Sequence, residues 1–493
     1  MASLSRAILV LGAVSVIGSA TQVAKGKLGA QLLGAAGVGI LNQLTSLYGL
    51  LFIVAGLGFF NGTMHQITKA VRDGDGRQAR AHMNSVTLFI GGVSLLVSLG
   101  CVAGAGWISD MLFGDGGQRA ALVAVIVLAV PIAVQQRVFR AYLNAMHDIR
   151  SISRAQTGAD VTSVLIFALG AWLFGIRGAV AAFVGMHVLL FCGMMAYAVK
   201  SGGIGLALPS FRSFRWPEIA ANFGFGINGL ITTAVSSLAM IALGRMVISV
   251  AGLAEAGIFS VALKVATVYL GALYASAGGY YFPTLVRSET RDELQLEVNR
   301  AVALYMTLLP PVMVVLIGFG DIIIPLLFSD EFRPAVPVMA GLLFGDIFRV
   351  GFETTGLALT ANRRLVASTL IYIVYSAGFV GLSWWMLPWL GLKGIALAYI
   401  VMSALNFALI LAMCRLSLAI RLSSEGVAAM SLAVLAVAPE ALAELAGLGF
   451  VPRLGIGAAS LTVWLALSWQ LPEMARLRAQ TGARLGRFTR LRA

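Results

Sequence analysis

The chain consists of long apolar stretches joined by short polar connections. Apolar runs of about 18–25 residues follow one another, the length that an α-helix needs to cross about 30 Å of hydrocarbon. The pattern predicts an all-α, polytopic membrane protein with fourteen transmembrane helices. Their expected limits are 5–24, 40–60, 84–106, 120–143, 157–174, 178–199, 219–245, 257–283, 301–320, 338–360, 366–388, 394–413, 424–441 and 454–471.

Composition supports this reading. Hydrophobic residues make up 59% of the 493 residues and charged residues 11%, against about 45–50% and about a quarter in soluble domains. The excess apolar surface therefore faces lipid. The first apolar run has no convincing signal-peptide cleavage site, so we expect it to remain as a transmembrane helix.

The distribution of positive charge predicts the orientation. If the N-terminus is cytoplasmic, most of the 35 Lys and Arg fall on the cytoplasmic side, as the positive-inside rule requires. The pair Arg363 and Arg364 and the tail from Arg476 to Arg492 are examples. Orientation explains the net charge of +14 better than nucleic acid does, and the tail is expected to bind anionic membrane lipid. Both termini are predicted to be cytoplasmic.

Several classes of function are disfavoured. The predicted connections are too short for an extramembrane catalytic domain, and no G-x-x-x-x-G-K-[ST] motif is present. The three cysteines and four histidines lack metal-binding spacing. We therefore expect no enzymatic activity, no cofactor and no metal site, and any uphill work would use an ion gradient or a partner.

Two halves of the chain repeat at a nearly constant offset. Lys27, Gly34 and Gly39 match Arg245, Gly252 and Gly257, 218 residues later, and the stretch 175–178 matches 391–394, 216 residues later. A six-span repeat gives two parallel six-helix lobes around a central cavity, with two helices added. The expected domains are a first lobe at 1–200, a cytoplasmic linker at 201–218, a second lobe at 219–416, two additional helices at 417–472 and a basic cytoplasmic tail at 473–493.

Short motifs carry a family resemblance. They are GVGI at 37–40, GFFNG at 58–62, YYFP at 280–283, LFSDEF at 327–332 and GDIFRV at 345–350. Their order and spacing resemble the polysaccharide flippases of the multidrug/oligosaccharidyl-lipid/polysaccharide exporter superfamily, in particular Wzx-type translocases. The loop signature of the major facilitator superfamily is not present in the stretch 70–77.

The resemblance implies a function. Such proteins move undecaprenyl-diphosphate-linked oligosaccharides of O-antigen, capsule or exopolysaccharide from the cytoplasmic to the periplasmic leaflet of the bacterial inner membrane, and proton coupling is proposed for some. The implied partners are the lipid-linked glycan and membrane lipid, with a polysaccharide polymerase or glycosyltransferases as further candidates. We expect a monomer that binds no nucleic acid. The alternative is a small-molecule or multidrug cation antiporter of the same superfamily.

Charged residues within the spans are the candidates for coupling or gating, because a charge in hydrocarbon is costly unless it is paired or hydrated. Asp346, Arg349 and Glu353 share one helical face of the tenth span. The alternative for this stripe is a self-neutralised structural role. Asp160 is the only acid within the first six spans, and we expect it to pair with Arg137 or Arg140.

Basic and amide side chains are the candidates for substrate binding. Arginine forks match phosphate oxygens, so Arg137 and Arg140 of the fourth span are predicted to receive the diphosphate, and snorkelling to the headgroups is the competing account. The remaining predicted binding residues are Lys25, Lys27, Arg245, Lys264, Asn61 and Asn144. The surplus of cations in the first lobe disfavours the cation antiporter.

Overall fold

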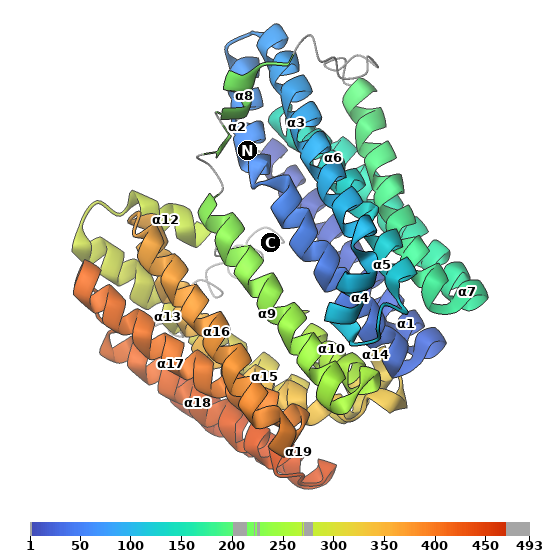
Figure 1. The fold of residues 1–493 in the computed structure, drawn as a ribbon. Coiled ribbons are helices and arrows are strands. Elements are labelled where there is room, and N and C mark those ends of the chain that lie inside the picture. The colour runs from blue at the N-terminus through green and yellow to red at the C-terminus, as the bar shows by residue number, and fades with distance from the viewer. Residues whose placement is uncertain are drawn as a thin grey trace, which may run out of the picture. The chain divides into compact units, whose positions relative to one another are not determined.

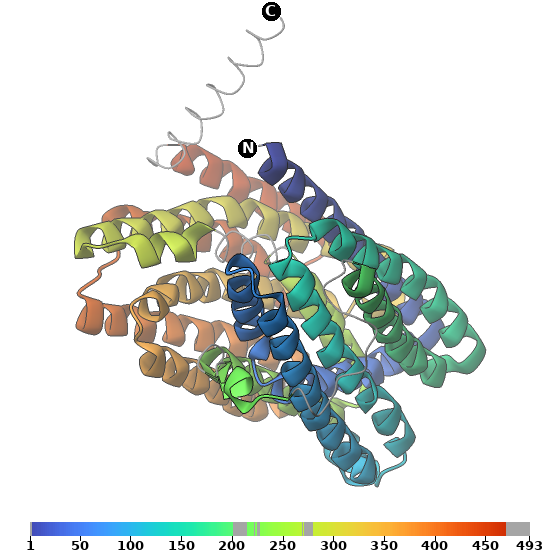
Figure 2. The same cartoon turned by 90° about the horizontal axis from the view of Figure 1, so that it is seen from above.

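The computed structural model describes residues 2–200, 214–220, 222–223, 227–268, 270 and 280–469, and their side chains except those of 2–16, 61, 227, 228 and 268. The regular elements in these ranges are all helices (Figure 1, Figure 2). Most of the predicted linker and the whole basic tail lie outside the described residues, as do 271–279 of the predicted eighth span.

The described residues form two compact units. The first comprises those of 1–257 together with Leu327–Ser329. Its helices are α1 (Ala2–Gly56), α2 (Phe59–Arg72), α3 (Gly76–Ala103), α4 (Ala105–Phe113), α5 (Ala120–Val127), α6 (Ala129–Ala145), α7 (Ile149–Lys200), α8 (Trp216–Ala220), α9 (Ile227–Ala251) and the start of α10 (Leu253–Val268).

The second unit comprises the remaining described residues from Ile258 onward. Its elements after α10 are α12 (Phe282–Arg287), α13 (Arg291–Gly318), α14 (Gly320–Leu327), the 3₁₀ turn η4 (Asp330–Phe332), α15 (Ala335–Ala361), α16 (Leu365–Leu390), α17 (Leu392–Leu418), α18 (Ser424–Leu445) and α19 (Phe450–Ser468). Its centre is α15, which packs against α13, α17 and α18. The predicted lobes 1–200 and 219–416 stay a prediction.

Within the described residues, eleven helices are long and apolar enough to cross a membrane. The chain is therefore a multi-pass membrane protein. Two of these helices, α1 and α7, each cover two predicted spans, and their backbones break at Gly34 (φ 64°) and Gly175 (φ 58°). The expected connection at 25–39 is helical on both sides of Gly34. The total of fourteen transmembrane helices stays a prediction.

The break in α7 is a tight helical hairpin. A Cβ added at Gly178 would meet the backbone of Gly170, and one added at Gly170 would meet Gly178. The two halves of α7 therefore approach at backbone distance on either side of Gly175, which only small residues allow. Asp160 lies on the half of α7 before Gly175 and His187 on the half after it, and the hairpin folds these two halves against each other.

Candidate functional site

A cavity in the first unit is lined by one cation. Its volume is about 560 Å³, and α1, α2, α3, α6 and α9 contribute to its wall. The guanidinium of Arg137 lies 4.9 Å from the ring centroid of Phe52 and 5.1 Å from that of Phe60. Glycines at 49, 56, 58 and 229 line the same wall, so that much of the lining is backbone or aromatic ring.

The cavity carries uncompensated positive charge. Arginine stays protonated in proteins, and among the described residues Arg137 has no carboxylate within ion-pair distance. Arg140 lies one turn further along α6 with an exposed side chain and does not line the cavity. Arg137 and Arg140, the two residues predicted to bind phosphate, thus share one face of α6, and of the two Arg137 lines the cavity.

A second polar group surrounds Lys25. Its ammonium donates to Ser163 Oγ at 3.2 Å and lies 3.5 Å from Met186 Sδ. Asp160 lies within electrostatic range of Lys25 and accepts from Gln156 Nε2 at 3.2 Å. Lys25 thus bridges α1 to both halves of α7.

This arrangement corrects the expected partner of Asp160. Among the described side chains, Asp160 forms no ion pair with Arg137 or Arg140, and the cation that acts on it is Lys25. Neighbours within one span follow from helix geometry, but the choice between cations on different spans depends on packing.

Sequence reasoning missed an aromatic path between the two sites. His187 is buried, and both its ring nitrogens lack a hydrogen-bond partner within the described part of the chain. Its ring centroid lies 4.9 Å from that of Tyr48, which in turn stacks on Phe52 at 5.8 Å. His187 lies within electrostatic range of Lys25, and Phe52 lies under Arg137, so the path extends from the Lys25 group to the cavity. The spacing of the four histidines along the sequence does not indicate that His187 contacts Tyr48.

The cavity lining includes none of the other predicted binding residues whose side chains are described in the first unit. Lys27 and Asn144 are half-buried, Lys264 on α10 is exposed, and the side chain of Asn61 lies outside the described residues. Arg245, near the end of α9, packs its guanidinium against Gly114, at the turn that follows α4.

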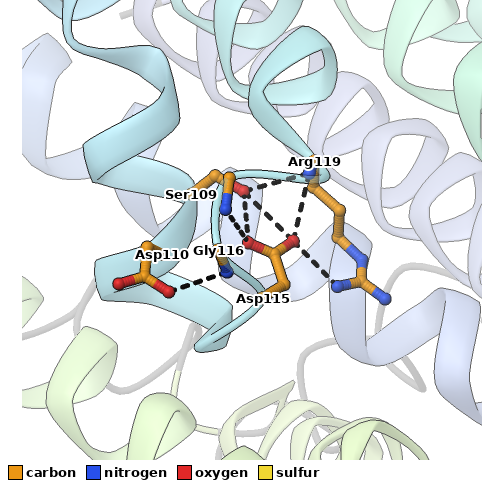
Figure 3. Close-up of polar contacts among 6 residues, drawn as sticks. Ser109, Asp110, Asp115, Gly116 and Arg119 are labelled. Atoms are coloured by element: carbon orange, nitrogen blue, oxygen red, sulfur yellow. Dashed lines mark hydrogen bonds and ion pairs between the residues drawn. The ribbon is translucent and has the colours of Figure 1, made fainter.

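The turn against which Arg245 packs is held by one carboxylate (Figure 3). Asp115 accepts from Ser109 Oγ at 2.9 Å, from the Gly117 amide at 2.9 Å and from the Arg119 guanidinium at 2.9 Å. Burial alone would raise the pKa of Asp115, but these hydrogen bonds and the charge of Arg119 lower it below the ordinary value. The turn is therefore a fixed support for Arg245.

In the second unit, the predicted stripe of α15 forms a connected network. Arg349 Nε donates to Glu353 Oε1 at 2.8 Å, and its Nη1 lies 4.0 Å from Asp346 Oδ1. Tyr399 of α17 completes the network, because its hydroxyl donates to buried Asp346 and accepts from Arg349 Nη1 at 3.1 Å. The expected ion pairs within the helix are present, and Tyr399 is the member that sequence reasoning missed.

The network is largely shielded. Asp346 is 1% exposed, the Phe379 ring packs beside Tyr399, and the Tyr375 ring packs beside Phe352. The second carboxylate oxygen of Glu353 has no partner among the described residues. A half-buried acid with an unused acceptor oxygen can take up a proton or change its hydrogen-bond partner. No group of three or more His, Cys, Asp and Glu within the described ranges could hold a metal ion.

Taken together, the long apolar helices are those of a polytopic membrane protein, and its first unit holds a cavity lined by an arginine. The chain belongs to the polysaccharide biosynthesis protein family, whose model matches residues 30–337. This match confirms the expected resemblance to the polysaccharide flippases of the multidrug/oligosaccharidyl-lipid/polysaccharide exporter superfamily.

Relatives and solved structures agree with this family. The Lipid III flippases of Escherichia coli (strain K12) and Shigella flexneri are each 24% identical over 411 residues, covering 83% of this chain and 97% of the relative. The fold is similar to an inward-facing multidrug resistance MATE family transporter of the MOP superfamily (TM-score 0.69, 16% identity, 84% of this chain and 98% of that one). It is also similar to the Lipid II flippase MurJ in an inward closed conformation (TM-score 0.67, 14% identity, 94% and 98%).

Proposed function

We propose that this protein moves an undecaprenyl-diphosphate-linked oligosaccharide from the cytoplasmic to the periplasmic leaflet of a bacterial inner membrane. The observation that carries the proposal is the guanidinium of Arg137, which lines a cavity of about 560 Å³ without a carboxylate partner among the described residues. The positive charge of Arg137 in this cavity attracts an anion, and its planar guanidinium group can donate two parallel hydrogen bonds to phosphate oxygens.

The glycan would be the repeat unit of an O-antigen, a capsule or an exopolysaccharide. The names of the Lipid III and Lipid II flippases support a lipid-linked substrate. The headgroup would change leaflets inside the protein while the prenyl chain stays in lipid, and rocking of two lobes would give alternating access.

Two polar groups are the proposed coupling and gating elements. The network of Asp346, Tyr399 and Arg349 has a buried acid whose partners come from two helices. The group of Lys25 and Asp160 joins α1 to α7. In both, a change of protonation would alter the contact between helices, which is how a bound proton can favour one conformation.

A multidrug cation antiporter is the second candidate, favoured by the similarity to a MATE family transporter. A cationic drug needs an acidic or aromatic pocket. Here the Phe52 and Phe60 rings are already covered by Arg137, so a cationic ligand would meet a like charge. The cavity thus supports the anionic substrate better.

The proposal is tested with the purified full-length protein in vesicles, using a fluorescent undecaprenyl-diphosphate oligosaccharide and a membrane-impermeant quencher. We expect Arg137→Ala with Arg140→Ala to slow flipping tenfold or more, because each charged hydrogen bond contributes about 1.5–3 kcal/mol. Arg154→Ala, which removes an exposed arginine of α7, is the control and should leave the rate unchanged. Wild-type flipping by the double variant would refute the assigned site.

A second arm separates the two candidates. Uptake of a cationic dye by the same vesicles should be absent in the wild type. If the dye is transported and Arg137→Ala increases its transport without any effect on the lipid-linked glycan, the antiporter is the correct function.

A further inference from the structure

The helix pair α18 and α19 encloses a buried acid that none of the proposed sites uses. Glu440 is 1% exposed. Its carboxyl lies against Gly318 of α13 and Gly457 of α19, where any added Cβ would collide with it. Two glycines on two neighbouring helices thus leave the space that this carboxyl occupies.

The charged group around Glu440 comes from three helices, α14, α18 and α19. Arg453 of α19 is 2% exposed, forms ion pairs with Asp321 of α14 and Glu444 of α18, and lies within electrostatic range of Glu440. Lys393 of α17 donates to the Leu445 carbonyl at 2.8 Å and takes part in neither of these ion pairs. From α13, Gly318 lies against the Glu440 carboxyl.

The charges of this group do not balance if every acid is ionised. Arg453 is already engaged by Asp321 and Glu444, which leaves Glu440 as an additional negative charge. Its Oε2 atom and Arg453 Nε have no hydrogen-bond partner among the described residues. An uncompensated carboxylate at this depth costs several kcal/mol, whereas the neutral acid does not carry that penalty.

We propose that Glu440, Glu444, Asp321 and Arg453 form a proton-binding site in which Glu440 holds the proton. The site lies where α18 and α19 pack on α13 and α14, apart from the Asp346 network on α15 and α17. Loss of the proton places a second unbalanced charge between these helices and weakens their packing. The site does not depend on the transported substrate, so its test is independent of the proposed function.

The test compares infrared spectra of the full-length protein in lipid vesicles, in which a neutral carboxylic acid absorbs apart from a carboxylate. We expect the wild type to show a carboxylic acid band at neutral pH that Glu440→Gln removes. Glu425→Gln is the matched control, because Glu425 is an exposed acid on the same helix, and it should leave the band unchanged. Identical acid bands in the wild type and Glu440→Gln would overturn the proposal.

Two further measurements cover the case in which Glu440→Gln fails to insert. Glu440→Asp keeps a carboxyl group in the site, so the acid band should shift rather than vanish, and an unshifted band would contradict the assignment. In the wild type the band should weaken as the pH is raised, together with the thermal unfolding midpoint, because deprotonation adds the unbalanced charge. A band and a midpoint that stay constant from mildly acidic to alkaline pH would also refute the site.

Discussion

Gly39 of α1 lies against the backbone of Gly257, near the start of α10. A Cβ at Gly39 would meet the Leu253 carbonyl and the Gly257 amide, and a Cβ at Gly257 would meet the Ala35 carbonyl. These are the two glycines that the 218-residue offset pairs. The backbones of α1 and α10 therefore approach too closely at this point for a side chain to fit between them, and the parallel repeat stays a prediction.

Replacing either glycine by alanine should destabilise the protein. The backbones leave no room for a methyl group, and overpacking of this kind costs about 1–3 kcal/mol. We expect Gly39→Ala and Gly257→Ala to lower the thermal unfolding midpoint in detergent. Gly49→Ala is the control on α1, because nothing lies within 4 Å of its added Cβ. Equal midpoints for Gly39→Ala and Gly49→Ala would show that the helices can separate freely at this point.

A second repeat-related pair shares an unusual backbone conformation. Gly175 has φ 58° and ψ −137°, and Gly391 has φ 57° and ψ −147°. This region is essentially restricted to glycine, and another residue there costs about 1–3 kcal/mol. Gly175→Ala and Gly391→Ala should therefore each reduce the free energy of unfolding by a similar amount. Gly381→Ala, within α16 and without neighbours at its Cβ, should be neutral or slightly stabilising, and a similar loss there would argue against the conformational explanation.

The sequence predicts what depends on one helix at a time. Apolar length gives the spans, and helix geometry correctly places Arg349 beside Glu353. Contacts between helices are harder to predict from the sequence. A transmembrane helix is apolar on all sides, so its pattern of apolar residues does not show which face packs against which neighbouring helix. For this reason Tyr399 was missed although it contacts Asp346, and Asp160 was assigned to the wrong cations.

Removing the hydroxyl of Tyr399 should uncouple Asp346 from Arg349. Tyr399→Phe removes the hydrogen bond that buried Asp346 accepts from this hydroxyl, and a hydrogen bond to a charged group contributes about 1.5–3 kcal/mol. We expect a lower unfolding midpoint and, if the network couples transport to protons, a flipping rate that no longer responds to a pH gradient. Tyr375→Phe is the control, since its hydroxyl makes one long contact of 3.4 Å with Ser403. Unchanged stability and pH response in Tyr399→Phe would remove this hydroxyl from the network.

The turn held by Asp115 should lose stability in acid. Hydrogen bonds from Ser109, Gly117 and Arg119 keep the pKa of Asp115 below its ordinary value despite burial. An acid with a lowered pKa in the folded state contributes stability that is fully present above its unfolded pKa, about 3.9, and is lost as the pH falls through the folded pKa. The Gly117 and Arg119 amides both donate to Asp115, so their protection from hydrogen exchange, relative to the intrinsic rate at each pH, should fall only in strong acid. In Asp115→Asn the same amides should exchange faster already at neutral pH, while Asp148→Asn, at the start of α7 on another turn, should not affect them. Slow exchange of both amides in Asp115→Asn would show that the turn is held by the backbone alone.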